Sequence, residues 1–404
     1  MNRDDHDDAR SPRPPRSLFI TNDFPPRVGG FQSYYYGLIQ TLSPDDVVIM
    51  APAYAGAEQF DAGIPYRVHR VETPVVWPTP RHLEMALGLI DDFRPELVQM
   101  GHPLPAGLLA PVLKKRTGLP YLVFLGGAEL TVPAVMPGAA AATRYVIERA
   151  ALLVSVSDFT TNAARRHTGG RVSCATLRPY IDVDRFTIAC PGEKAEAKNA
   201  LGVSGPLVVC VGRLVPRKGQ DRLVDAVGLL RHEFPGLELG IVGDGRLRDR
   251  LWRKAVRLGI SRRVHLAGEV KDEALRTWLR AADIFASPCR VRWGGLEVEG
   301  FGLVFAEAAL MGLPVLAGRS GGAIEAVKTG ETGLAVCGSR VEEVAEGLRR
   351  LLLLSEDERQ TLGEVGRGLA LSRHTREVVG ARYRELLRSA VACKGWSGGN
   401  GSRG

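Results

Sequence analysis

RVRWGGLEVEGFGLVFAEAALMGLPVLAGRSGGAIE, residues 290–325, combines two carboxylates, a glycine-rich turn and an apolar pattern that runs from helix to strand. Glu299 and Glu307 stand eight residues apart, and Gly-Phe-Gly follows the first of them. The pattern predicts a helix over 306–311, a stop at Gly312 and then a buried strand. We therefore expect Glu299 on the loop that enters the helix and Glu307 one to two turns inside it.

The start of such a helix has free backbone N–H groups, and these favour an anion. One carboxylate beside that anion and a second further along the helix suit a ligand with a phosphate between two polyols. A nucleotide sugar has this shape. A solvated loop with a capping glutamate would show the same pair of acids, so the interpretation depends on the other motifs in the chain.

Length and composition indicate a globular protein with room for two domains, since the chain has 404 residues, 45% hydrophobic and 24% charged. The sequence contains no apolar run near the ~20 residues that span a bilayer. Residues 1–16 are rich in acids and prolines and do not resemble a signal peptide, so we expect disordered tails at 1–16 and 393–404. Six cysteines without a CxxC pair fit reduced thiols in a cytosolic protein.

The net charge of +8 is unevenly distributed along the chain. Residues 1–190 hold 19 Lys/Arg and 19 Asp/Glu, whereas the remainder holds 34 against 26. A basic second half suits a polyphosphate ligand or an anionic surface, although arginine-rich solvated helices give the same excess. No basic strip with interleaved aromatics is present, so nucleic acid is not an expected partner.

Strands alternate with helical segments in both halves, which predicts a parallel α/β sheet in each. Residues 186–205 have a weak pattern with several Pro and Gly and form the best domain boundary. We expect domains at 17–190 and 191–372, and a final helix within 373–392. The predicted strands are 17–22, 47–51, 97–101, 121–125 and 152–157 in the first half, and 207–214, 239–242, 264–267, 284–287, 314–317 and 333–336 in the second.

Glycine pairs and cations follow several of these strands. Gly29-Gly30 lies between the first strand and a helix, where backbone amides can approach a phosphate closely, although a plain turn has the same sequence. The loop from Gly212 to Gly219 contains Arg213, Arg217 and Lys218 at a strand end, as a diphosphate leaving group requires.

Weaker signals follow the later strands. Gly243-Asp-Gly245 could border a nucleotide, and Ser320-Gly-Gly322 offers further close-approach amides, while we expect Glu325 on a helix face. Asp182-Val-Asp184 imitates the metal-binding DxD triplet of some sugar transferases. Its place near the domain boundary favours a turn or a cap, so we predict no metal and no cofactor.

Taken together, these motifs resemble the retaining glycosyltransferases of family 4, which have the two-domain GT-B fold. The resemblance covers about residues 17–390. RKGQD (217–221), WGGLEVEG (293–300) and AGRSGGA (317–323) further resemble the PimB-type phosphatidylinositol mannosyltransferases. The resemblance implies two Rossmann-like domains that face a cleft, with the C-terminal helix crossing back to the first domain.

The resemblance also implies roles for individual residues. Arg213 and Lys218 would hold the diphosphate, and Glu307 would accept hydrogen bonds from ribose hydroxyls. Glu299 would grip the sugar, and no enzyme nucleophile would be needed. The donor contacts implied are at Gly29, Gly30, Arg213, Lys218, Gly243, Glu299, Phe301, Gly302, Leu303 and Glu307.

Two positions depart from the family. LRPYID (177–182) lacks the glycine that usually follows its proline, and the second departure bears on catalysis. A histidine usually follows the strand predicted at 121–125, but here the loop reads Leu125-Gly-Gly-Ala-Glu129, which places Gly126 at the histidine position. His102 ends the neighbouring strand and is the alternative candidate. The predicted catalytic set is therefore Glu299, Arg213, Lys218 and His102, and a structural role for His102 stays open.

The resemblance implies a metal-independent retaining hexosyltransferase that moves mannose from GDP-mannose to a lipid-linked or polyol acceptor such as a phosphatidylinositol mannoside. It implies a cytoplasmic protein with peripheral contact to the inner face of the plasma membrane. The alternatives are a UDP-sugar-dependent transferase, an isomerase like the sugar 2-epimerases, and a catalytically weakened nucleotide-binding partner subunit. Neither predicted domain has the GxGxxG of a dinucleotide enzyme, a spacing that occurs in this sequence only as GNGSRG (399–404) in the expected tail.

Overall fold

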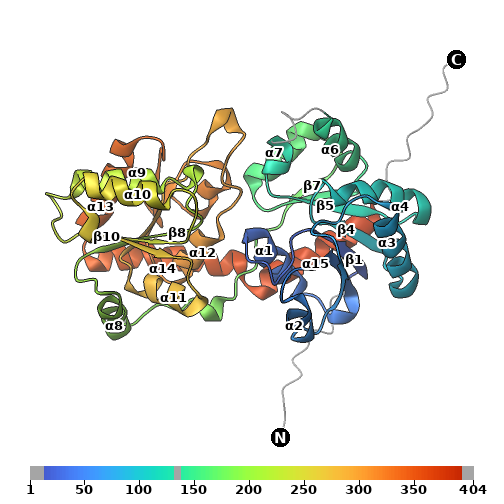
Figure 1. Cartoon of the computed structure of the whole chain (residues 1–404), viewed down its shortest axis with the longest axis horizontal. Helices are drawn as coiled ribbons and strands as arrows, with labels where there is room; N and C mark the ends of the chain where they lie inside the picture. Colours follow the sequence, from blue (N-terminus) through green and yellow to red (C-terminus); the bar gives the residue numbers. More distant parts are fainter. Residues whose placement is uncertain (1–12, 132–137, 394–404) are drawn as a thin grey trace, which may run out of the picture.

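The computed structural model describes residues 13–131 and 138–393, which fold into two α/β domains joined side by side (Figure 1). All described strands belong to two parallel sheets, with the orders β3-β2-β1-β4-β5-β6-β7 and β10-β9-β8-β11-β12-β13. In each sheet the order reverses beside the first strand, so the chain winds outward in both directions. This doubly wound arrangement confirms the predicted fold class.

The first sheet is built from short, mostly buried apolar strands that alternate with helices. Its strands are β1 (Ser17–Ile20), β2 (Val47–Pro52), β3 (Arg67–Val71), β4 (Leu97–Met100), β5 (Tyr121–Leu125), β6 (Leu152–Ser155) and β7 (Cys174–Thr176). Its helices are α1 (Gly30–Ile39), α2 (Ala57–Ala62), α3 (Pro80–Phe93), α4 (Leu109–Thr117), α5 (Ala128–Thr131), α6 (Ala139–Ile147) and α7 (Asp158–Thr168).

The second sheet repeats the pattern. Its strands are β8 (Leu207–Val211), β9 (Glu238–Val242), β10 (Val264–Gly268), β11 (Ile284–Ser287), β12 (Val315–Gly318) and β13 (Gly333–Val336). Its helices are α8 (Pro191–Leu201), α9 (Gln220–Leu230), α10 (Arg248–Arg257), α11 (Asp272–Ala281), α12 (Leu303–Leu310), α13 (Val341–Leu353) and α14 (Glu356–His374). Apolar residues of α9, α10 and α13 cover one face of this sheet, and those of α8, α11, α12 and α14 cover the other.

The chain crosses between the domains twice, and the two crossings are hydrogen-bonded to each other. The backbone N–H of Ile181 donates to the carbonyl of His374 at 2.9 Å, and the His374 ring contacts the carbonyl of Pro179 at 2.7 Å. Burial lowers the pKa of His374 to about 4, so the ring is neutral and its Nδ1–H can donate this bond.

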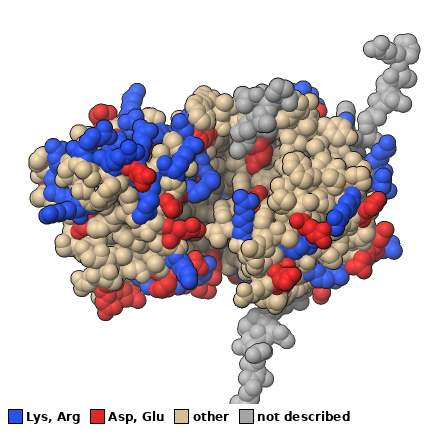
Figure 2. Space-filling view, viewed as in Figure 1, with Lys and Arg blue, Asp and Glu red and all other residues tan. Residues whose placement is uncertain are grey.

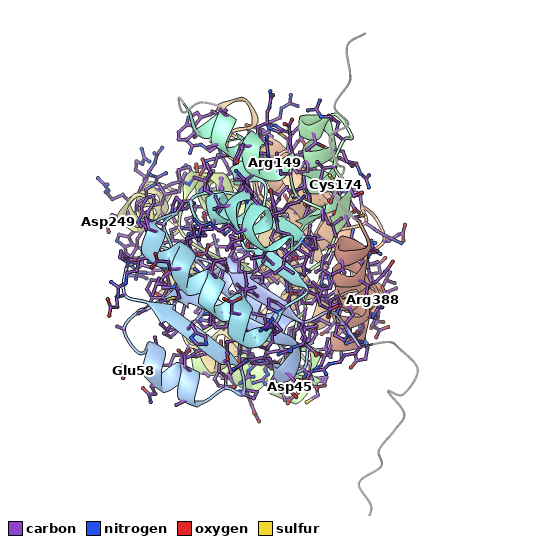
Figure 3. The ribbon with its side chains drawn as sticks, turned by 90° about the vertical axis from the view of Figure 1, so that its right-hand side faces the viewer. Asp45, Glu58, Arg149, Cys174, Asp249 and Arg388 are labelled. Carbon is purple, nitrogen blue, oxygen red and sulfur yellow. The ribbon has the colours of Figure 1, made fainter. Side chains whose placement is uncertain are left out.

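Helix α15 (Arg376–Ala392) returns to the first domain, along which it runs in Figure 3, where Arg388 is labelled. The buried Tyr383 hydroxyl donates to Gln99 on β4 at 2.7 Å, and Arg384 donates to the carbonyl of Thr41 at 3.2 Å. The last helix of the second half is therefore part of the first domain's core. Among the described residues, no helix is long and apolar enough to cross a membrane.

Some predicted boundaries were wrong, and each for a local reason. Helix α12 begins at Leu303, three residues before the predicted start, because Gly302 adopts φ 81° and caps it there. Residues 186–205 contain α8 because Pro191 occupies the first helical position, where it favours a helix. The edge strands β3 and β7 were not predicted, since RVHRV is too polar and CAT too short to give an apolar pattern.

Candidate active site

Glu299 lies where two loops from neighbouring strands of the second sheet meet. Its carboxylate binds Arg217 at 2.5 Å and Lys218 at 3.0 Å. The two cations come from the loop after β8, and Glu299 comes from the loop after β11, the strand that pairs with β8. The carboxyl ends of parallel strands meet at one edge, which explains this convergence.

Glu299 and Lys218 are both buried, and each retains its charge because the other is present. Burial alone would raise the pKa of Glu299, but Lys218 and Arg217 hold it below the usual value. Burial would lower the pKa of Lys218, but Glu299 raises it above the usual value. Nearby, burial and the charge of Glu299 raise the pKa of the Cys289 thiol to about 11, so the thiol stays protonated.

Arg213 and Lys218, which were predicted as a pair, occupy different environments. Lys218 is buried against Glu299, whereas the side chain of Arg213 is exposed and has no hydrogen-bond or ion-pair partner among the described residues. Its carbonyl is fixed by Gln220 at 3.0 Å. Arg217, quoted in the motif but not assigned a role, is the second cation on Glu299.

Glu307 is the fifth residue of α12 and is partly exposed. Desolvation raises its pKa to about 7, with only partial compensation from Arg185. Arg185 ends the short helix η4 (Val183–Arg185), and the Asp182 side chain caps this helix by accepting from the N–H of Asp184. The DxD-like triplet therefore forms a cap, as its position in the sequence predicts.

The glycines around Glu299 allow backbone segments to pack closely. The N–H of Gly322 donates to the Glu299 carbonyl at 2.8 Å, and a Cβ on Gly321 would lie 2.0 Å from that carbonyl oxygen. A Cβ on Gly300 would lie 2.4 Å from the carbonyl oxygen of Gly126 in the first domain. The loop of Glu299 therefore touches the opposite domain at this point.

Backbone N–H groups are available beside Glu299. Phe301, Gly302 and Leu303 have no acceptor for their N–H groups within the described residues. The ring of Phe301 is buried and lies 5.4 Å from that of His374, so its side chain anchors the loop at the domain crossing. This arrangement leaves the amides at the helix start for an anion or a hydroxyl.

The other predicted glycines differ in what surrounds them. A Cβ on Gly243, at φ 127°, would lie 2.3 Å from the carbonyl oxygen of Gly212, so glycine is needed here for packing between loops. A Cβ on Gly29 would meet the side chain of Gln32. A Cβ on Gly30, the first residue of α1, would meet open space.

His102 lies between two carboxylates in the first domain. Its Nε2 is 2.8 Å from Asp23, and its Nδ1 is 3.0 Å from Glu129. Burial would lower the pKa of His102, but Asp23 and Glu129 raise it to about 9, so the ring is cationic at neutral pH. Glu129 also accepts the N–H of Gly126 at 2.9 Å, which ties His102 to the loop that lacks the family histidine.

Phe31 occupies the place that a side chain at position 126 would take. A Cβ on Gly126 would lie 1.9 Å from the tip of the Phe31 ring. The same ring meets His102 edge to face, with centroids 4.7 Å apart. Gly126, Phe31 and His102 thus form one packed unit, and the sequence did not indicate that Phe31 belongs to it.

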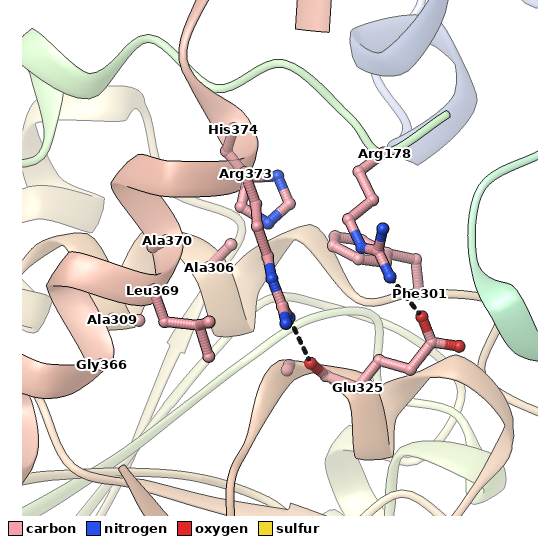
Figure 4. Close-up of a pocket in the computed structure, with 11 residues that line it drawn as sticks. Arg178, Phe301, Ala306, Ala309, Glu325, Gly366, Leu369, Ala370, Arg373 and His374 are labelled. Atoms are coloured by element: carbon pink, nitrogen blue, oxygen red, sulfur yellow. Dashed lines mark hydrogen bonds and ion pairs between the residues drawn. The ribbon is translucent and has the colours of Figure 1, made fainter. Parts of the chain in front are cut away.

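Glu325 lies on the short helix η8 (Gly321–Ala326), as expected, but its contact with the first domain was not predicted. Its carboxylate accepts the N–H groups of Asp158 at 3.0 Å and Phe159 at 2.7 Å, at the start of α7, and it contacts Arg178 at 3.3 Å. The Arg373 side chain donates to the Glu325 carbonyl at 3.3 Å. Figure 4 shows Arg178 and Arg373 converging on Glu325 from the two domain crossings.

Comparison with known proteins places this geometry in a family. Residues 192–368 match the family model described as "Glycosyl transferases group 1", and residues 29–179 match the "Glycosyl transferase 4-like domain". The chain is 37% identical over 377 residues to the GDP-mannose-dependent alpha-(1-6)-phosphatidylinositol monomannoside mannosyltransferase of Mycolicibacterium smegmatis. The matched region covers 92% of this chain and 97% of that protein. The chain is 35% identical to a related mannosyltransferase of Corynebacterium glutamicum, over 93% of this chain and 98% of that protein.

Solved structures show the same fold at lower identity. Anabaena Alr3699/HepE in complex with UDP and glucose superposes with a TM-score of 0.78 at 20% identity, covering 93% of this chain and all of that chain. A sucrose-phosphate synthase of Thermosynechococcus elongatus gives 0.76 at 20% identity, covering 93% and 99%. The chain belongs to the group 1 glycosyltransferases, with a glycosyltransferase 4-like first domain and the GT-B architecture.

Proposed function

We propose that this glycosyltransferase moves mannose from GDP-mannose to a phosphatidylinositol-type glycolipid, with retention at the anomeric carbon and without a metal. The observation that carries the proposal is the pair of cations on Glu299, Arg217 and Lys218, with the exposed Arg213 on the same loop at one strand edge. The mannosyltransferases named above, at 35–37% identity over almost the whole chain, supply the donor and the acceptor class.

These cations fit a diphosphate leaving group. Guanidinium and ammonium groups stabilise the negative charge that develops on the departing nucleotide, as a metal ion would do elsewhere. Lys218 is preorganised by Glu299, and Arg213 is available to the second phosphate. An incoming diphosphate would share the cations with Glu299, whose carboxylate then turns to the hydroxyls of the sugar.

Glu307 and the start of α12 complete the donor site. Glu307 would accept from ribose hydroxyls, and the N–H groups of Phe301 to Leu303 would bind the sugar or its phosphate. With the leaving group and the acceptor hydroxyl on one face of the sugar, no enzyme nucleophile is required. Catalysis then depends on position and electrostatics.

The first domain would present the acceptor and close over the sugar. The cationic His102, with Phe31 and Gly126, occupies the wall from which the family histidine would reach the sugar. We propose that His102 supplies positive charge near the transferred sugar from behind Phe31. Because the acceptor is lipid-linked, the transfer reaction would take place at a membrane surface, which we propose is the cytoplasmic face of the plasma membrane.

A thermal-shift panel of GDP, UDP and ADP with their sugars tests the donor. Specific binding stabilises the folded chain by about 2.7 kcal/mol at a hundredfold excess over Kd. Selective stabilisation by GDP and GDP-mannose is expected, and selective stabilisation by UDP would replace this donor with a UDP-sugar. A 2-epimerase would convert the donor sugar even when no acceptor is present, so product analysis without an acceptor distinguishes it from a transferase. Turnover of any donor would exclude a nucleotide-binding partner subunit that lacks catalytic activity. Activity is expected to survive excess chelator.

A further inference from the structure

Helix α10 has a second, outward face that packing inside the domain does not require. Leu251 and Ala255 are buried against the second sheet, whereas Trp252, beside them on the flank of the helix, is 46% exposed. Val256, one turn further along, is exposed as well. An exposed tryptophan beside an exposed aliphatic side chain is an amphipathic feature that the core does not explain.

This outward face is strongly basic. Residues 246–257 contain six Lys and Arg and one acid, Asp249, although Lys254 pairs with Asp225 at 2.5 Å and Arg248 donates to the carbonyl of Leu266 at 3.1 Å. Figure 2 shows Lys and Arg gathered over the part of the second domain where α9 and α10 lie in Figure 1. Arg246, Arg250 and Arg253 are exposed. Asp249 is labelled at the edge of the molecule in Figure 3 and marks the helix at the surface.

A basic cavity continues this surface toward the loop after β11. The cavity measures about 220 Å³ and is lined by four arginines, Arg222, Arg250, Arg290 and Arg292, of which Arg290 pairs with Asp221 at 3.0 Å and Arg292 with Glu297 at 2.8 Å. Beyond it, Trp293 is 65% exposed and lies 4.5 Å from the Arg292 guanidinium. An exposed tryptophan therefore lies against one lining arginine of the cavity, and a second, Trp252, belongs to the helix that supplies Arg250.

The α10 part of this surface is separate from the proposed donor site, whereas the cavity borders the loops that carry Arg217 and Glu299. Glu307 belongs to α12, which covers one face of the second sheet, whereas α9 and α10 cover the opposite face. Arg250, Trp252 and Arg253 belong to α10, and within the described residues none of them forms a hydrogen bond or ion pair with Glu299, Lys218 or Glu307. Substitutions on α10 therefore test the surface without touching the donor site.

We propose that α10 and the arginine-lined cavity dock the second domain on an anionic phospholipid surface. Lys and Arg are drawn to anionic headgroups, each strengthening binding about fivefold near the surface. Trp side chains favour the headgroup level, where one end of the ring is apolar and the other hydrated. The cavity can take a lipid phosphate. The inference rests on the proposed function only in favouring a lipid surface over other polyanions, because the acceptor is itself a lipid.

The test is sedimentation of the full chain with vesicles of neutral phosphatidylcholine, and of phosphatidylcholine with about one-third phosphatidylglycerol or phosphatidylinositol. Wild type is expected to bind the anionic vesicles and to lose binding at high salt. Arg250→Glu with Arg253→Glu should weaken that binding at least tenfold, and Trp252→Ser should weaken it severalfold. Arg350→Glu, which changes an exposed arginine of α13 in the same domain, is the matched control and should bind like wild type.

Each outcome decides the proposal. Lack of vesicle binding by wild type, equal binding to neutral vesicles, or equal losses in the α10 variants and Arg350→Glu would overturn it. Tighter retention by duplex DNA than by anionic vesicles would replace the membrane with nucleic acid. GDP-induced thermal shifts measured on the same variants should match wild type, which shows that the donor site is folded. Failure of GDP to bind wild type would contradict the proposed function but leave the vesicle result standing.

Discussion

Glu299 holds an ionised carboxylate in a buried position because two cations from a neighbouring loop lie within 3.0 Å of it. Removing one partner of a buried ion pair leaves the other uncompensated, which typically costs about 3–5 kcal/mol. Arg213 is exposed and has no partner in the part of the chain that the structure describes, so it is under no such constraint. Of the two residues predicted to hold the diphosphate, Lys218 therefore also contributes to the stability of the fold, whereas Arg213 does not.

This difference gives the first prediction. Arg213→Ala and Lys218→Ala should each lower kcat/KM more than tenfold, since a charge-assisted contact to a leaving group contributes on the order of 1.5–3 kcal/mol. Only Lys218→Ala should also lower Tm, because it leaves the buried Glu299 carboxylate with one neighbouring cation instead of two. Steady-state kinetics and thermal unfolding measure the two effects, with Arg350→Ala as the control. Wild-type kinetics in a folded double variant would refute the diphosphate assignment.

The second prediction follows from Glu307, whose pKa is raised to about 7. Hydroxyls that donate to this group favour its ionised form, so nucleotide binding should release a proton and should strengthen as pH rises through 7. Affinity for GDP, measured by calorimetry in two buffers of different ionisation enthalpy, should rise by up to about tenfold from pH 6 to 8. Phosphate titration contributes to the same rise.

Glu307→Gln separates the two contributions, because it removes the carboxyl titration and keeps the side-chain shape. The variant should bind GDP more weakly at pH 8 and should lose most of the pH dependence. A pH profile identical to that of wild type would show that the ribose is held elsewhere. Glu299→Ala should leave the affinity for bare GDP nearly intact and depress sugar transfer instead.

Gly126 gives the third prediction. Restoring the family histidine there would place a Cβ 1.9 Å from the Phe31 ring. Gly126→His alone should therefore destabilise the chain or displace Phe31 without a gain in rate. The double variant Phe31→Ala with Gly126→His gives the new side chain room and should turn over about tenfold faster than Phe31→Ala alone.

His102→Ala belongs to the same experiment. If the cationic ring acts near the sugar, this variant should lower kcat in wild type and should lower it less in the double variant, where the new histidine takes over. His102→Gln, which keeps a hydrogen-bonding group between Asp23 and Glu129, controls for collapse of the site. If all these variants turned over as fast as wild type, the loop would lie away from the sugar.

At the scale of elements, the strands and helices that could be predicted are those whose apolar residues follow a regular local pattern. Strands β5, β11 and β13 were predicted to the residue because each is a short apolar run bounded by turn residues. Glu299 and Lys218 could be assigned to one site because both follow strands, and parallel strands deliver their loops to one edge. α8 was missed because Ala197 is its one buried residue among those described, which gives almost no helical period.

Contacts between distant elements could not be predicted. Phe31 against Gly126, Glu129 on His102 and Glu325 on α7 join residues from different elements, and no spacing in one sequence encodes them. Glu129 was quoted in its motif without a role, since a carboxylate near a glycine pair has many uses. A site built between domains depends on how the domains meet, which is a property of the whole fold.

At the scale of the whole molecule, polar groups hold the two domains together beside the site. Glu325 of the second domain occupies the start of α7, where two free N–H groups and the helix dipole favour an anion. Arg178 joins Glu325 to Asp158 at 3.3 and 2.6 Å. Polar contacts of this kind separate more readily than an apolar interface, which suits domains that open to admit a donor.

The last prediction concerns this contact. Glu325→Ala leaves the start of α7 without its anion and Arg178 without one of its two partners, so the domains should separate more often. The radius of gyration from small-angle scattering should increase, and kcat should fall at least fivefold because the sugar and the first domain align less often. The affinity for GDP should change less than twofold, since the proposed donor contacts belong mostly to the second domain. Glu331→Ala, an exposed acid that pairs with Lys328 in the same domain, is the control and should match wild type in all three measurements. An unchanged radius of gyration and kcat in Glu325→Ala would show that the two crossing segments around His374, and not Glu325, set how the domains meet.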